Sequence, residues 1–138
     1  MIVAHTRILG IDPGERRVGL AVSDPLGITA QGLDTFDRRE GDLTEHLRKL
    51  VEEYEVGEIV VGHPLSMSGR PSETTRSAEA LARDIEAALG LPVSLWDERL
   101  TSAEAKRVLA GSRAPKGATD RIAAALILQG YMDAKGTG

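Results

Sequence analysis

Short apolar runs alternate with turn residues in the first part of this 138-residue chain. The runs cover residues 8–12, 17–23 and 28–36, and the Pro-Gly pair at 13–14 gives a tight turn between the first two. Apolar runs of this length, bounded by glycine and proline, are typical of buried strands. Because the connections are short, the pattern predicts three strands in an antiparallel meander.

The rest of the chain alternates between helical and strand-like patterns. Apolar residues recur at helical spacing, as Leu43, Leu47 and Leu50 do, and Thr101 and Glu104 have capping-box spacing at the start of a further helix. The expected helices cover residues 41–55, 72–89 and 101–110, and a last helix begins near Thr119. The expected strands are residues 58–62 and 92–96. Residues 63–71 are expected to form a loop, and residues 111–117 a flexible basic segment.

This order of elements predicts a single α/β domain over residues 1–138. The meander passes into right-handed strand–helix–strand crossovers, so the first strand lies centrally and the two later strands run parallel to it. The expected sheet has five strands in the mixed order 3-2-1-4-5, with helices on both faces. That is the ribonuclease H-like arrangement.

The composition fits a domain of this kind. Apolar residues make up 41% of the chain, enough for a core, and the absence of cysteine excludes disulfides and cysteine-based zinc sites. No apolar stretch approaches the roughly 18 residues of a membrane span, and the N-terminus lacks the apolar region of a signal peptide. We therefore expect a cytoplasmic protein that has no membrane partner.

Charge is unevenly distributed along the chain. The net charge of −4 argues mildly against a nucleic-acid partner. However, residues 34–58 hold nine acidic and four basic residues, whereas residues 99–121 hold six basic and two acidic ones. Such opposed regions can orient a polyanion, or they can be two ordinary solvated faces.

Three carboxylates from distant parts of the chain are expected at one edge of the sheet. Asp12 ends the first strand, Glu98 follows the fifth, and Asp120 begins the last helix, which can pack across the sheet. Oxygen ligands of this kind suit Mg²⁺ or Mn²⁺ rather than zinc. Two such ions about 3.5–4 Å apart can activate water and stabilise the leaving oxygen of a phosphodiester. Asp97 and Glu98 point in opposite directions on an extended backbone, and we expect Glu98 to be the one in the site.

Each carboxylate also has a simpler interpretation. Asp12 can be part of an Asp-Pro-Gly turn, Glu98 can be a surface acid before a helix, and Asp120 can favour the positive end of a helix dipole. Their coincidence at one edge of this topology favours the metal site.

Four motifs in this order resemble those of the YqgF family. The motifs are residues 10–14 with 17–24, residues 61–69, residues 97–101, and residues 116–120 followed by the alanines at 123 and 124. The resemblance spans nearly the whole chain. YqgF proteins resemble Holliday-junction resolvases and are described as nucleases that mature the 5′ end of pre-16S ribosomal RNA.

The resemblance implies a ribonuclease H-like fold and a divalent-metal nuclease, with the family's acidic residues at Asp12, Glu98 and Asp120. Phosphate contacts are expected from basic side chains, which position a substrate without reading its sequence. The candidates are Arg17, Arg99, Arg113 and Lys116.

The loop at 63–69 departs from the family pattern. His63 stands where an aliphatic residue is usual, and Ser66 and Ser68 stand where Asn and Asp are common. His63 is interpreted as an ordinary loop histidine, with a proton shuttle as the alternative. The departures affect the contacts of this loop and not the acidic triad.

The leading hypothesis is an endonuclease that acts on pre-rRNA or branched DNA, with a ribosome precursor as a candidate partner. The alternative is a nucleic-acid-binding factor in ribosome maturation or transcription that does not cut. A third class, the actin-like ATPases, shares the Gly-Ile-Asp-x-Gly strand end but needs two such domains to enclose nucleotide, and 138 residues supply one.

Overall fold

The structure is a computed structural model that describes residues 7–65, 68–98 and 116–135, with the side chains of the last range from Arg121 onward. The predicted helix at 101–110 lies outside these ranges. The strands are β1 (Arg7–Asp12), β2 (Arg17–Ser23), β3 (Ala30–Asp37), β4 (Val56–His63) and β5 (Val93–Asp97). The helices are η1 (Arg38–Glu40, a 3₁₀ turn), α1 (Leu43–Tyr54), α2 (Glu73–Leu89) and α4 (Lys116–Lys135).

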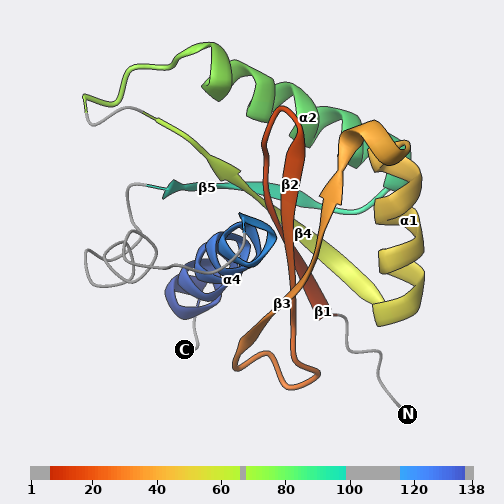
Figure 1. The fold of residues 1–138 in the computed structure, drawn as a ribbon. Coiled ribbons are helices and arrows are strands. Elements are labelled where there is room, and N and C mark those ends of the chain that lie inside the picture. The colour runs from red at the N-terminus through yellow and green to blue at the C-terminus, as the bar shows by residue number, and fades with distance from the viewer. Residues whose placement is uncertain (1–6, 66–67, 99–115, 136–138) are drawn as a thin grey trace.

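The five described strands form one mixed sheet in the order β3-β2-β1-β4-β5, as predicted. β1 pairs antiparallel with β2 and parallel with β4, and β4 pairs parallel with β5. α1 and α2 cover one face of the sheet and α4 covers the other (Figure 1). The predicted placement of helices on both faces is therefore confirmed.

Each face of the sheet has its own apolar cluster. Leu9 and Ile11 of β1 are fully buried in the cluster under α1 and α2, together with Leu47 and Ile85 from those helices. The cluster under α4 has fewer buried members among the described residues. It contains Ala21, Val60, Ala124, Leu128 and Met132.

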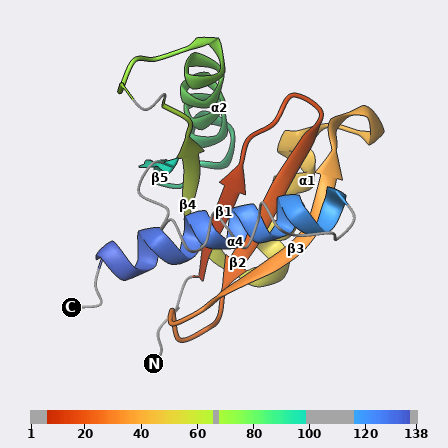
Figure 2. The same cartoon turned by 60° about the vertical axis from the view of Figure 1, so that its left-hand side comes forward.

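α4 lies very close to the backbone of the sheet. A Cβ added to Gly10 of β1 would stand 2.8 Å from the Cβ of Leu128, and one added to Gly32 of β3 would overlap the side chain of Arg121. Figure 2 shows α4 running across the strands from beside β3. The absence of side chains at these glycines is what lets the helix approach this closely.

Polar contacts fix the far end of α4. Lys135 Nζ lies 2.8 Å from Glu58 Oε1, and the Tyr131 hydroxyl donates to the same carboxylate of β4. Partial burial alone would raise the pKa of Glu58, but the hydrogen bonds from Lys135 and Tyr131 outweigh burial and hold that pKa below its usual value. The charged form of Glu58 is therefore the one that the fold stabilises.

The predicted boundaries are close to the observed ones, with two corrections. α4 begins at Lys116 and not near Thr119, so the flexible segment expected over 111–117 is wrong for its last two residues. His63 ends β4 instead of opening the following loop.

Among the described helices, none is both long enough and apolar enough to cross a membrane.

Gly10→Ala is expected to destabilise the protein by about 1–3 kcal/mol, because the new methyl group meets the Cβ of Leu128 and not the flexible end of a side chain. The measurement is urea unfolding of both proteins. Gly41→Ala is the matched control, since a Cβ there meets only Phe36 Cζ at 3.7 Å, an ordinary contact. Equal stability of the Gly10→Ala variant and the wild type would contradict the close helix–sheet contact.

Candidate active site

Three parallel strands end at the same edge of the sheet. Asp12 is the last residue of β1, His63 of β4 and Asp97 of β5. His63 pairs in register with Asp97, and the β1–β4 pairing runs to the residue before Asp12. The carboxyl ends of the three strands are therefore nearly level, which is where ligand sites of α/β sheets collect.

Asp12 lies on the α4 face of this edge. Its neighbours Leu9 and Ile11 point into the cluster under α1 and α2, whereas Gly10 faces α4. Because side chains alternate along a strand, Asp12 shares the face of Gly10. It is half-buried there.

Glu98 reaches the same face from two strands away. A Cβ added to Gly62 of β4 would stand 2.7 Å from Glu98 Oε2 and 2.8 Å from Ile127 Cδ1 of α4. The carboxylate of Glu98 thus lies over the backbone of β4, the strand between β1 and β5. Gly62 leaves the space that it occupies, and this brings Glu98 toward the end of β1.

Asp97 belongs to the opposite face. Trp96 packs in the cluster under α4, so alternation turns Asp97 toward α2. Its register partner His63 is on that side too, with Nε2 2.8 Å from Glu79 Oε2 of α2. The placement of His63 agrees with a structural histidine and puts its imidazole on the face away from Glu98.

Asp120 is the fifth residue of α4 and does not begin the helix as predicted, because α4 starts at Lys116; it stands in line with Ala124 and Ile127 by helical spacing. Its side chain is outside the described part, as is that of Lys116, the first residue of α4. Arg99 and Arg113 also lie outside the described residues. Within the described residues, no group of three or more His, Cys, Asp or Glu side chains could hold a metal. The full acidic triad therefore stays a prediction.

Of the predicted phosphate contacts, Arg17 is described; it is the half-buried first residue of β2. Arg121, part of the basic region at 99–121, has a different role. Its Nη2 lies 2.8 Å from Asp34 Oδ1, and its Nε donates to the Leu33 carbonyl at 3.1 Å. Arg121 of the basic region therefore forms an ion pair with Asp34 of the acidic region, on the edge strand β3.

Three arginines near this edge, Arg16, Arg38 and Arg39, were not predicted as site residues. Arg38 and Arg39 belong to the acidic region of the sequence, yet the backbone of Arg38 bonds to the Arg16 carbonyl at 2.8 Å beside the β1–β2 turn. The signal in the sequence was the presence of two arginine pairs, 16–17 and 38–39, at the facing ends of paired strands.

Comparison with known proteins identifies the family. The family model RuvX, described as Holliday junction resolvase, matches residues 6–134. The chain belongs to the RuvX family. RuvX is the YqgF family of the sequence analysis, so the resemblance found there is confirmed.

RuvX relatives match nearly the whole chain. A protein of Koribacter versatilis is 51% identical over 96% of this chain and 90% of its own length, and one of Lachnospira eligens is 44% identical over 94% of this chain and 98% of its own length. Both carry the name "Putative pre-16S rRNA nuclease".

Solved structures support the fold. RuvC of Thermus thermophilus superposes with a TM-score of 0.60 at 15% identity, covering 94% of this chain and 97% of its own. The same protein in complex with a Holliday junction substrate gives a TM-score of 0.59 at 18% identity, covering 96% and 98%. The ribonuclease H-like fold predicted from the sequence is confirmed.

Gly62→Ala is expected to displace Glu98 while leaving the protein folded. The added methyl group would meet Glu98 Oε2 and Ile127 Cδ1, both at the ends of flexible side chains. If Glu98 is a metal ligand as predicted, Mn²⁺ should raise the melting temperature of the wild type and raise that of the variant much less. Thermal melts with EDTA and with Mn²⁺ measure this, and a full Mn²⁺ response in the variant would show that Glu98 is not a ligand.

Proposed function

We propose that this protein is a divalent-metal-dependent endonuclease that hydrolyses phosphodiester bonds of structured nucleic acid. The observation that carries the proposal is that Asp12 and Glu98 share the α4 face at the level ends of β1, β4 and β5, with Gly62 leaving room between them. The names of the RuvX relatives support pre-16S rRNA as the substrate. The reaction that we propose is maturation of its 5′ end, on a ribosome precursor in the cytoplasm.

In this proposal Asp12, Glu98 and Asp120 hold Mg²⁺ or Mn²⁺. The donor set fits, because its atoms are carboxylate oxygens, and these ions prefer oxygen ligands. When bound, such ions supply an activated water and stabilise the leaving oxygen. The protein holds the carboxylates in place by strand alternation and by the close packing of α4. Arg17, Arg99, Arg113 and Lys116 contact the phosphates on either side.

A second candidate substrate is branched DNA. The description of the RuvX family and the Holliday junction bound to the RuvC neighbour favour it. Cleavage of a pre-rRNA fragment and of a four-way DNA junction in one buffer with Mn²⁺ separates the two substrates. If the wild type cuts neither, the protein is a binding factor and the nuclease proposal is wrong.

Glu98→Gln is expected to abolish cleavage, whereas Asp97→Asn keeps measurable activity. The reason is the alternation at the end of β5, which turns Glu98 to the face of Asp12 and Asp97 to the face of α2. The measurement is the single-turnover rate of each variant on the better substrate. Loss of activity in Asp97→Asn alone would place the chemistry on the opposite face.

Asp12→Asn is expected to melt, without metal, at least as high as the wild type. Carboxylates that converge repel one another, and the substitution removes one charge with almost no change of shape. It should also lose most of the stabilisation by Mn²⁺, which for the wild type is about 2.7 kcal/mol at a hundredfold excess over the dissociation constant.

The measurement is a thermal melt of both proteins with EDTA and with Mn²⁺, followed by a cleavage assay. A metal-free melting temperature several degrees below wild type, with the Mn²⁺ response intact, would make Asp12 a structural turn residue.

A further inference from the structure

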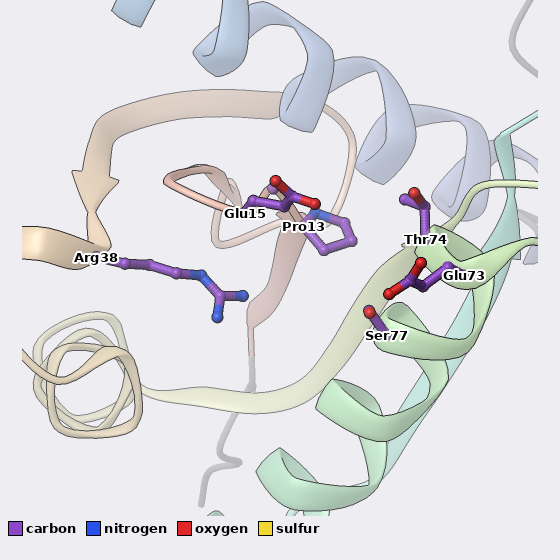
Figure 3. A pocket seen from close by; sticks show the side chains of 7 residues that line it. Pro13, Glu15, Arg38, Glu73, Thr74 and Ser77 are labelled. Atoms are coloured by element: carbon purple, nitrogen blue, oxygen red, sulfur yellow. The ribbon is translucent and has the colours of Figure 1, made fainter.

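A polar cavity opens beyond the end of β1, on the side of the sheet that α2 covers. It has a volume of about 310 Å³ and lies between the β1–β2 turn, the η1 turn and the first turns of α2 (Figure 3). Its walls include Pro13 and Glu15 of the turn, Arg38, and Glu73, Thr74 and Ser77 of α2. Pro13 directly follows Asp12, so the cavity opens at the edge of the sheet where β1 ends, on the side of α2, whereas the carboxylates of the candidate active site lie on the α4 face.

The charged groups of this cavity face one another without touching. Figure 3 shows the Arg38 side chain extending into the cavity from one wall, with Glu73 and Ser77 on the wall opposite. In the described ranges, neither Arg38, Glu73 nor Glu15 makes an ion pair. A ligand that fits between them needs hydrogen-bond acceptors toward the arginine and donors toward a carboxylate.

A basic rim, formed by Arg16 and Arg39, adjoins the cavity on the side of Glu15 and Arg38. Arg16 follows Glu15 in the chain and Arg39 follows Arg38, and both are held by Asp37, with Nε–Oδ distances of 3.3 and 3.4 Å. The Arg16 and Arg39 side chains remain 50% and 65% exposed, whereas Asp37 is 20% exposed. One carboxylate thus orients two guanidinium groups toward solvent, and guanidinium groups match phosphate geometry.

We propose that the cavity and its rim bind one unpaired nucleotide of the substrate strand, with the phosphate on Arg16 and Arg39 and the base between Arg38 and Glu73. This inference rests on the proposed nuclease function. Unstacked bases are read in this way, through hydrogen bonds to their edges. Guanine fits best, because it offers the paired acceptors O6 and N7 to an arginine and the paired donors N1–H and N2–H₂ to a carboxylate.

The test measures binding apart from cleavage. Labelled uridine pentamers with a central guanosine, adenosine or inosine are titrated with the protein in EDTA, and fluorescence anisotropy gives the dissociation constants. Guanosine should bind at least about fivefold more tightly than adenosine, as expected for one good bidentate contact. Inosine lacks the N2 amino group and should lose part of this preference.

Variants locate the site. Glu73→Gln and Arg38→Ala should abolish the guanosine preference, whereas Arg16→Ala should weaken all three pentamers alike and flatten the salt dependence. Glu86→Gln and Arg83→Ala are matched controls, because they remove exposed charges farther along α2 and should leave the preference unchanged.

Equal binding of the three pentamers, or a guanosine preference that survives both cavity variants, would overturn the inference. The result is separate from the nuclease test. A protein that prefers guanosine but cuts neither substrate keeps the nucleotide site and loses the nuclease proposal. A protein that cuts but binds all pentamers equally keeps the nuclease proposal and loses this site.

Discussion

The contact between α4 and the backbone of the sheet determines the rest of this structure. Gly10 and Gly62 leave no side chains between the helix and the strands, so Leu128 and Ile127 lie almost on the backbone of β1 and β4. The cluster beneath α4 includes two alanines, Ala21 of β2 and Ala124 of α4 itself. The same lack of a side chain at Gly62 gives Glu98 its place over β4. One packing requirement therefore both holds α4 on the sheet and shapes the candidate active site.

α4 also protects an edge of the sheet. β3 is an outer strand, and outer strands present unpaired backbone groups that can pair with other chains. Gln129 accepts from the Ala30 amide at 3.0 Å and donates to the Ile28 carbonyl at 3.0 Å, and Arg121 donates to the Leu33 carbonyl. The helix thus hydrogen-bonds to backbone groups of β3 and of the residues just before it. The pairing of Arg121 with Asp34 shows why the charge separation in the sequence is not simply a separation of two surfaces.

The topology could be predicted from the sequence because each strand and helix has a clear local pattern. The order of the strands then follows from short connections and right-handed crossovers, which leave little choice. The faces of Asp97 and Glu98 could be predicted too, since alternation at the end of β5 is a local property. The space above Gly62 could not, because it depends on Ile127, far away in the chain.

The arginines of the cavity and its rim were missed for a related reason. Arg38 and Arg39 lie among acidic residues in the sequence, so a count of charges along the chain makes their region acidic. That count hides the basic groups that the fold brings together there. Only the pairing of β2 with β3, in which Arg17 stands opposite Asp37, brings these arginines beside the β1–β2 turn. Charge patterns along a chain describe surfaces poorly where sheet pairing joins distant segments.

Register is what keeps the two faces of the functional edge distinct. A slip of one residue in β1 would turn Asp12 toward α2 and Ile11 toward α4. The β1–β4 ladder has an irregularity, but it falls between Arg7 and Ile8, at the amino end. There the Ile8 amide bonds to the buried hydroxyl of Ser23 at 2.8 Å, so the irregularity leaves this donor satisfied. Beyond it the pairs from Ile8 to Ile11 are regular, and four regular pairs lead directly to Asp12. The β1–β4 ladder thus has its irregularity at the end away from the candidate active site, and the alternation that separates Asp12 and Glu98 from Asp97 and His63 is preserved. The other register shift of the sheet, between Val18 and Leu20, lies in the β2–β3 ladder and leaves the pairing of the three parallel strands unchanged.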